Sequence, residues 1–95
     1  MRLSKEKRLF LKRLVKQRLP KSQVFLFGSR VDDRAKGGDI DLLILGERRL
    51  TLGEKIDLKV EFYKQFGQQK IDIVSYNKKE ESSFKASIIS SAKKL

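Results

Sequence analysis

The fold is decided by the sequence FGSR at residues 27–30, read together with GDIDLLI at residues 38–44. The first stretch ends an apolar run at Gly28, and the second opens another apolar run with Asp39 and Asp41. Because side chains alternate between the two faces of a strand, both carboxylates are expected to point the same way, roughly 7 Å apart. Two like charges so placed repel each other, and a divalent cation such as Mg²⁺ would turn that repulsion into a binding site.

The turn at Gly28 and Ser29 supplies a complementary feature. Small residues let backbone amides and a hydroxyl approach a phosphate closely, whereas the alternative is an ordinary tight turn. Nine residues separate Ser29 from Asp39, and a third strand acid, Asp72, lies downstream. This pattern resembles the nucleotidyltransferase superfamily that includes DNA polymerase beta. The resemblance is to its smallest members, the minimal nucleotidyltransferases (MntA-like) that pair with HEPN-domain proteins, and it covers nearly the whole chain.

The resemblance implies a role for each acid. In the family, the pair that matches Asp39 and Asp41 holds the divalent ions, Mg²⁺ or Mn²⁺, that bridge the phosphates of the nucleotide. Asp72 lies between two isoleucines, where an unpaired charge is costly. The resemblance implies that Asp72 converges on the same ion and activates the attacking hydroxyl. The alternatives are a strand-edge Asp72 paired with Lys or Arg, and a solvent-facing pair of acids at the strand end.

The same resemblance assigns the nucleotide-binding residues. Gly28 and Ser29 are expected to hold the β- and γ-phosphates of ATP or another nucleoside triphosphate, through backbone amides and the Ser hydroxyl. Arg30 either contacts the triphosphate or neutralises Asp32 or Asp33. No residue of the chain identifies itself as a reader of the base.

The expected activity is metal-dependent transfer of a nucleoside monophosphate, AMP from ATP, to an acceptor hydroxyl. The resemblance implies that the acceptor is a tyrosine of a partner HEPN toxin, so that the chain is an antitoxin acting by AMPylation. One alternative is a non-catalytic nucleotide- or partner-binding antitoxin module that acts by complex formation. Another is an RNA-associated protein that uses its basic first helix. Nucleic acid is the less favoured partner, because the aromatic residues fall mostly on predicted core faces.

Composition limits the possible chemistry. The 95 residues are expected to form one domain, 1–95, and the absence of Cys and His excludes disulfides, the usual zinc sites and His-based triads. A cytoplasmic protein is expected, with no membrane span, because no stretch approaches ~20 apolar residues. Of the net charge of +11, residues 1–37 carry +9. Such a field favours an anionic partner, such as a nucleoside triphosphate, RNA or an acidic protein face. A homo-oligomer is a further alternative that the composition leaves open.

Hydrophobic periodicity predicts an α/β (α+β) domain with a small mixed sheet of about three strands flanked by helices, in the order α-β-(α)-β-α-β-α. The first two strands should be antiparallel, because nine residues are too few for a parallel crossover, and the third should return parallel to the second. The expected elements are helix 4–19, a wholly apolar strand 23–28 covered on both faces, a helical turn at 30–34, strand 39–45, a helix within 47–69, strand 70–75 and helix 79–94.

Three helices have predicted core faces. In helix 4–19, Ser4 is the expected N-cap, and the core face is predicted to comprise Leu3, Phe10, Leu11, Leu14 and Val15. In the 47–69 segment, a capping box at Thr51 and Glu54 and a C-terminal Gly67 favour a helix, although residues 57–62 also alternate like a strand. Its core face is predicted to comprise Leu52, Ile56, Val60 and Tyr63. The core face of helix 79–94 is predicted to comprise Phe84, Ile88, Ala92 and Leu95.

Overall fold

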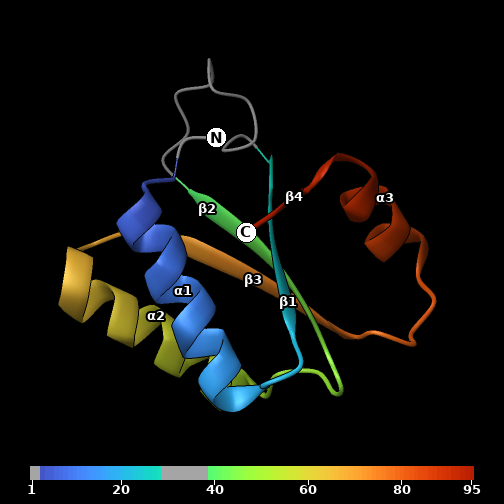
Figure 1. Cartoon of the computed structure of the whole chain (residues 1–95), viewed down its shortest axis with the longest axis horizontal. Coiled ribbons are helices and arrows are strands. Elements are labelled where there is room, and N and C mark those ends of the chain that lie inside the picture. The colour runs from blue at the N-terminus through green and yellow to red at the C-terminus, as the bar shows by residue number, and fades with distance from the viewer. Residues whose placement is uncertain (1–2, 29–38) are drawn as a thin grey trace.

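The computed structural model describes residues 3–28 and 39–95, which form a four-stranded mixed sheet flanked by helices (Figure 1). The strand order across the sheet is β3-β2-β1-β4. In chain order the elements are α1 (Lys5–Arg18), β1 (Gln23–Phe27), β2 (Ile40–Gly46), α2 (Leu52–Phe66), β3 (Ile71–Asn77), α3 (Ser83–Ser91) and β4 (Lys93–Lys94). The helical turn predicted at 30–34 lies outside the described residues.

The predicted strand directions are confirmed. β1 and β2 are antiparallel, and β2 and β3 are parallel and paired along seven residues from Ile40↔Ile71 to Gly46↔Asn77. The parallel return is made by α2, which is long enough to carry the chain back across the sheet. This topology brings the beginnings of β2 and β3 to the same end of the sheet as the end of β1.

The expectation of about three strands is corrected by β4, a two-residue strand that pairs antiparallel with β1. Hydrophobic periodicity predicts a helix over 79–94, but α3 ends at Ser91 and Ala92 caps it with an N–H bond to the carbonyl of Ile88. The chain then extends, and the N–H of Leu95 donates to the carbonyl of Val24 at 2.8 Å. Backbone pairing with the free edge of β1 therefore replaces the last turn of the predicted helix.

The sheet separates two apolar layers. In Figure 1, α1 and α2 lie side by side on one face and α3 lies on the other. The alternate residues Val24, Leu26, Ile40, Leu42 and Ile44 are buried beneath α1 and α2, together with Leu11, Leu14 and Val15 of α1. The core predicted for the first helix is thus confirmed, and Ser4 caps that helix as expected.

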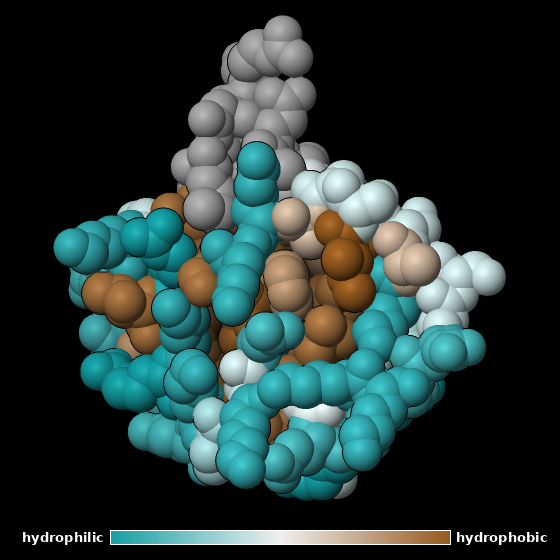
Figure 2. All heavy atoms as spheres, turned by 45° about the vertical axis from the view of Figure 1, so that its right-hand side comes forward, coloured by the Kyte–Doolittle hydropathy of each residue, from teal (hydrophilic) through white to brown (hydrophobic). Residues whose placement is uncertain are grey.

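The second layer, beneath α3, is smaller and less completely covered. Leu43, Leu45 and Ile88 are buried there, whereas Phe25 and Phe27 are only half-buried. Figure 2 shows hydrophobic side chains at the surface beside α3. β1 is accordingly buried under α1 and α2 and half-covered on its other face.

The predicted core face of α2 is wrong. The capping box of Thr51 and Glu54 and the C-terminal cap at Gly67 are present. The helix is rotated, however, so that Leu58 and Phe62 are buried and the predicted face is exposed: Leu52 74%, Ile56 49%, Val60 43% and Tyr63 59%. Phe62 packs against the rings of Phe10 and Phe66 at centroid distances of 6.3 and 4.9 Å, and this aromatic cluster joins α2 to α1.

The predicted core face of the last helix is also only partly correct. Ile88 is buried, but Phe84 is 56% exposed. Residues 79–82 are not helical because Asn77 and Glu80 close a turn, in which the N–H of Asn77 donates to Oε1 of Glu80 at 2.8 Å. Within residues 3–28 and 39–95, no helix is both long enough and apolar enough to cross a membrane.

Candidate active site

Asp41 occupies the junction of three strands. On β2 it is paired across the antiparallel ladder with Phe27, the last residue of β1, and across the parallel ladder with Asp72 of β3. Because the core residues Ile40 and Leu42 face α1 and α2, the side chain of Asp41 projects from the other face. Its register partner Asp72 is exposed and lies on the same face. Two of the three predicted acids are therefore brought together by the parallel register.

Asp39 lies just before β2 and has a basic neighbour that sequence reasoning missed. Its Oδ2 is 3.7 Å from Nζ of Lys70, the residue before β3. The backbone of Lys70 also accepts a hydrogen bond from the N–H of Ile40 at 3.0 Å, which fixes the start of β3 beside the start of β2. The sequence positions could have indicated this ion pair. Lys70 and Asp39 each directly precede a strand, and the two strands are parallel neighbours.

The electrostatics of Asp41 reflect this crowding of acids. Burial raises its pKa above the ordinary value of 3.8, and the charges of Asp72 and Asp39 raise it further. A hydrogen bond with the Asp72 side chain acts in the same direction, whereas the charge of Lys70 lowers the pKa. The folded chain thus holds a carboxylate that is electrostatically unfavourable until a proton or another cation approaches.

Gly28 leaves the space that the Asp41 carboxylate occupies. It has φ of 77°, in the left-handed region that favours glycine. A Cβ placed there would overlap Oδ2 of Asp41 and lie 3.2 Å from its Cγ. The predicted phosphate-binding turn and the predicted metal ligand are therefore in direct contact at Gly28. Ser29 and Arg30, the other two predicted nucleotide-binding residues, lie outside the described residues.

The donor chemistry of the site suits a hard divalent cation. Carboxylate oxygens are the ligands that Mg²⁺ prefers, and Asp41 is destabilised by the very charges that a cation would offset. Among residues 3–28 and 39–95, no group of three His, Cys, Asp or Glu side chains is placed so that it could hold a metal ion. Asp39 is instead engaged with Lys70. The carboxylates therefore fit a divalent cation in their chemistry. In the described part of the chain, however, the acids that lie together are Asp41 and Asp72, which are two ligands and not three.

The family model of the polymerase beta nucleotidyltransferase domain matches residues 10–95. The chain belongs to this nucleotidyltransferase family. The match extends over most of α1, the four strands and the remaining helices, so it includes Gly28 and all three acids. A search of curated proteins found no match.

Solved structures share the fold of this nucleotidyltransferase domain. A chain of the toxin–antitoxin pair MntA–HpeT, in a mutant form, aligns with a TM-score of 0.71 at 21% identity, covering 98% of this chain and 72% of that one. A protein from Shewanella oneidensis aligns with a TM-score of 0.69 at 17% identity, with coverages of 98% and 71%. A chain from the complex of a tri-AMPylated Shewanella oneidensis HEPN toxin with an MNT antitoxin aligns with a TM-score of 0.59 at 17% identity, with coverages of 93% and 70%.

Proposed function

We propose that this nucleotidyltransferase domain transfers AMP from ATP to a tyrosine of a HEPN-type partner and thereby acts as an antitoxin. The observation that carries the proposal is that Gly28 contacts Asp41, which is in register with Asp72. The proposal is supported by the chemistry of these residues, since a glycine turn can approach a phosphate and carboxylates can hold a cation. The similarity to chains from toxin–antitoxin complexes supports the choice of partner.

In this proposal, Asp41 and Asp72 would hold Mg²⁺ or Mn²⁺, and Asp39 would join them once its carboxylate turns from Lys70 to the ion. The bound ion would neutralise phosphate charge and polarise the α-phosphate. The turn at Gly28 orients the β- and γ-phosphates so that the departing pyrophosphate lies in line with the acceptor oxygen. Asp72, the most exposed of the strand acids, receives the proton of the acceptor hydroxyl. One P–O bond forms between the acceptor oxygen and the α-phosphorus, and the bond from the α-phosphorus to the bridging oxygen breaks.

The exposed face of α2 supports a protein partner. Leu52, Ile56, Val60 and Tyr63 recur at helical spacing and form a stripe on the side of α2 away from its buried residues. Exposed apolar side chains gathered on one helix face are typical of a protein interaction site. A helical partner with its own apolar stripe would cover this face in the way that one helix of a bundle covers another.

The test is co-expression of the chain with a HEPN-type partner, followed by intact-mass measurement of AMP on the partner. Wild type is expected to add AMP, and Asp41→Asn and Asp72→Asn are expected to add none. Asp57→Asn is the matched control, because Asp57 is an exposed acid on α2 whose ion-pair partner is Arg18, at the end of α1. Equal modification by wild type and Asp41→Asn would exclude the proposed chemistry.

The second candidate is a non-catalytic module that silences its partner by complex formation. It is motivated by Asp39, whose carboxylate lies beside Lys70 and outside any three-acid group in the described part of the chain. This hypothesis predicts that Asp41→Asn protects cells from the toxin as well as wild type does. It also predicts that Ile56→Ser with Tyr63→Ser abolishes protection. Loss of protection by Asp41→Asn, with binding of the partner intact, would favour catalysis.

A further inference from the structure

A second feature of the molecule lies at the end of the sheet where β1 begins. Gln23 begins β1 and Gly28 directly follows its last residue, so the two lie about 17 Å apart along an extended strand. Beside Gln23, α1, the loop after β3 and the segment at β4 line an open hollow of ≈ 560 Å³. Its lining includes five lysines from separate parts of the chain: Lys12, Lys16, Lys21, Lys78 and Lys94. Figure 2 shows the lower part of the molecule covered by long hydrophilic side chains.

We call the hollow that these five lysines line the lysine hollow. The positive charges of its lysines are almost uncompensated. Only Lys21 has a carboxylate partner among the described residues, Glu47 at 3.7 Å, and both side chains are exposed. Nζ of Lys16 reaches a neutral acceptor, the carbonyl of Ser22, at 3.5 Å. The hydroxyl of Ser22, at the wall of the hollow, is buried with no hydrogen-bond partner in the described part of the chain. An anion in the hollow would offset a standing repulsion among cations.

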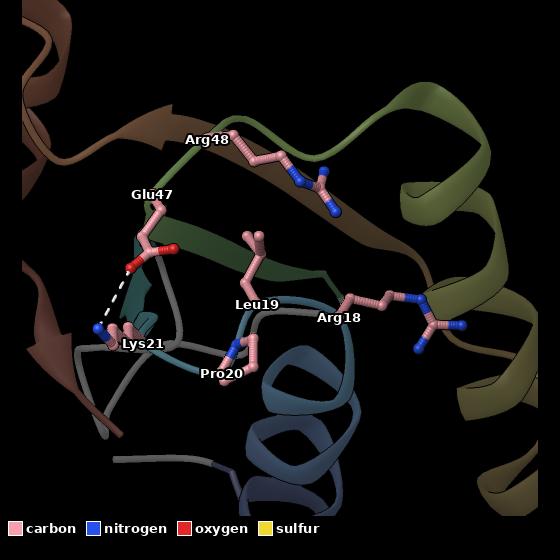
Figure 3. A pocket seen from close by; sticks show the side chains of 6 residues that line it. All are labelled: Arg18, Leu19, Pro20, Lys21, Glu47 and Arg48. Atoms are coloured by element: carbon pink, nitrogen blue, oxygen red, sulfur yellow. Dashed lines mark ion pairs between the residues drawn. The ribbon is translucent and has the colours of Figure 1, made fainter.

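A neighbouring pocket shows that this arrangement is unusual within the same protein. That pocket, of ≈ 350 Å³, also has three cationic side chains in its wall, and Lys21 belongs to both (Figure 3). There, however, each cation has an acid: Arg18 pairs with Asp57 at 3.9 Å and Arg48 with Glu54 at 2.7 Å. Figure 3 shows the two arginines extending toward α2, while Lys21 turns to Glu47. Within the described residues, the lysine hollow provides no such acid for four of its five lysines.

We infer that the lysine hollow binds the phosphodiester backbone of a nucleic acid without reading its sequence. Lysine is a compact point charge that suits phosphate oxygens, and phosphate contacts carry no base information. The core of a protein interface is depleted in lysine and enriched in aromatic side chains, and the hollow has the opposite lining. With no aromatic lining residue among those described, the hollow also offers no platform on which a base would stack.

The inference is tested by fluorescence polarisation with short labelled RNA and DNA of matched sequence, single- and double-stranded, over a range of salt concentrations. The double variants Lys12→Gln/Lys16→Gln and Lys78→Gln/Lys94→Gln each remove two positive charges. The matched control is Lys55→Gln/Lys59→Gln, which removes two charges at the same four-residue spacing from α2, outside the hollow. Gln has nearly the helix propensity of Lys, so the two variants on α1 and α2 should fold. Lys78 and Lys94 are exposed and lie outside the helices, so the third variant should fold as well, and thermal melts will check all three.

Each hollow variant is expected to bind every sequence more weakly. For a single strand, its slope of log K against log salt concentration should be shallower by about 0.7 for each phosphate that the variant no longer neutralises. Comparison of RNA with DNA identifies which groups of the nucleic acid are contacted. Equal affinity for the two indicates recognition of phosphate alone, whereas tighter binding of RNA indicates an added contact with the 2′-hydroxyl. The inference is overturned if the control loses as much affinity as the hollow variants. It is also overturned by a strong base preference, or by tighter binding of polyglutamate than of RNA at equal salt.

Discussion

Replacing Gly28 by alanine tests the contact on which the candidate active site depends. Two costs are expected. The first is backbone strain, because φ of 77° is left-handed and costs an L side chain about 1–2 kcal/mol. The second is displacement of the Asp41 carboxylate, since the new Cβ would overlap its Oδ2 and crowd its Cγ at 3.2 Å, against 3.4–4 Å for ordinary contact. In a domain of this size, each kcal/mol lowers Tm by about 4–8 °C.

The two costs are separated by a double-mutant cycle with Asp41→Ala, measured by urea unfolding. Removing the carboxylate should relieve the second cost of Gly28→Ala and leave the first. Gly67→Ala is the matched control, because Gly67 also has positive φ, 87°, but no described atom lies within 4 Å of the position that its Cβ would take. Gly67→Ala should therefore lose stability through strain alone and show no coupling to Asp41→Ala.

The reasoning is refuted if Gly28→Ala and Asp41→Ala are additive within about 0.5 kcal/mol, as independent sites are. Additivity would mean that the turn and the acid do not share space in solution. A nucleotide-transfer assay on the same proteins gives a second readout. Gly28→Ala should lose AMP transfer even at temperatures where it is fully folded, whereas Gly67→Ala should retain it under the same conditions.

Three further perturbations probe the acids and the core. At pH 7 Asp41→Asn should raise the Tm of the metal-free chain. The pKa of Asp41 is raised in the folded chain, so above pH 3.8 the native state binds more protons than the unfolded state and stability falls as the pH rises. A lower Tm would show that the acid is structural. Glu54→Gln should flatten the acid side of the stability profile. The hydrogen bond from Arg48 is the largest cause that lowers the pKa of Glu54 to about 2. The stabilisation by the Glu54 carboxylate is therefore present above pH 4.5 and lost as the pH falls toward 2. If Glu54→Gln and wild type show the same pH dependence of unfolding in urea across that range, the expectation is wrong. Ser75→Ala should lower the free energy of unfolding in urea by about 1–3 kcal/mol. Oγ of buried Ser75 accepts a hydrogen bond from the N–H of Leu50 at 2.8 Å, and alanine leaves that donor unpaired. A loss below about 0.5 kcal/mol, which is the range of ordinary surface changes, would show that the bond contributes little.

The local signals in the sequence were enough for most of the framework. Helix caps occur where the sequence predicts them, because capping depends on residues within one turn of each other. Ser4 begins α1, the Thr51–Glu54 capping box begins α2, and Gly67 ends α2. The nine residues between Ser29 and Asp39 were too few for a crossover, so the antiparallel pairing of β1 and β2 was set by chain length. The parallel direction of β2 and β3 followed from the same argument applied to the longer connection.

Three features depended on contacts between distant segments. α2 carries two apolar stripes, and packing against α1 and the sheet buries the one that holds Leu58 and Phe62. β4 forms because β1 leaves an unpaired edge, which a local pattern at residues 93–94 cannot reveal. The lysine hollow likewise collects side chains from α1, β4 and two loops, so that neither its shape nor its uncompensated charge exists until the chain is folded.

The order of elements as far as α3 and the strand directions can be derived without coordinates. The sequence also names Asp39, Asp41 and Asp72 as candidate acids. The surroundings of those acids required the folded chain: Lys70 beside Asp39, Gly28 against Asp41, and the shared register with Asp72. The difference comes from the range of the interactions. Caps, turns and hydrophobic periods act over a few residues, whereas burial and charge coupling depend on side chains that meet only after the sheet has formed.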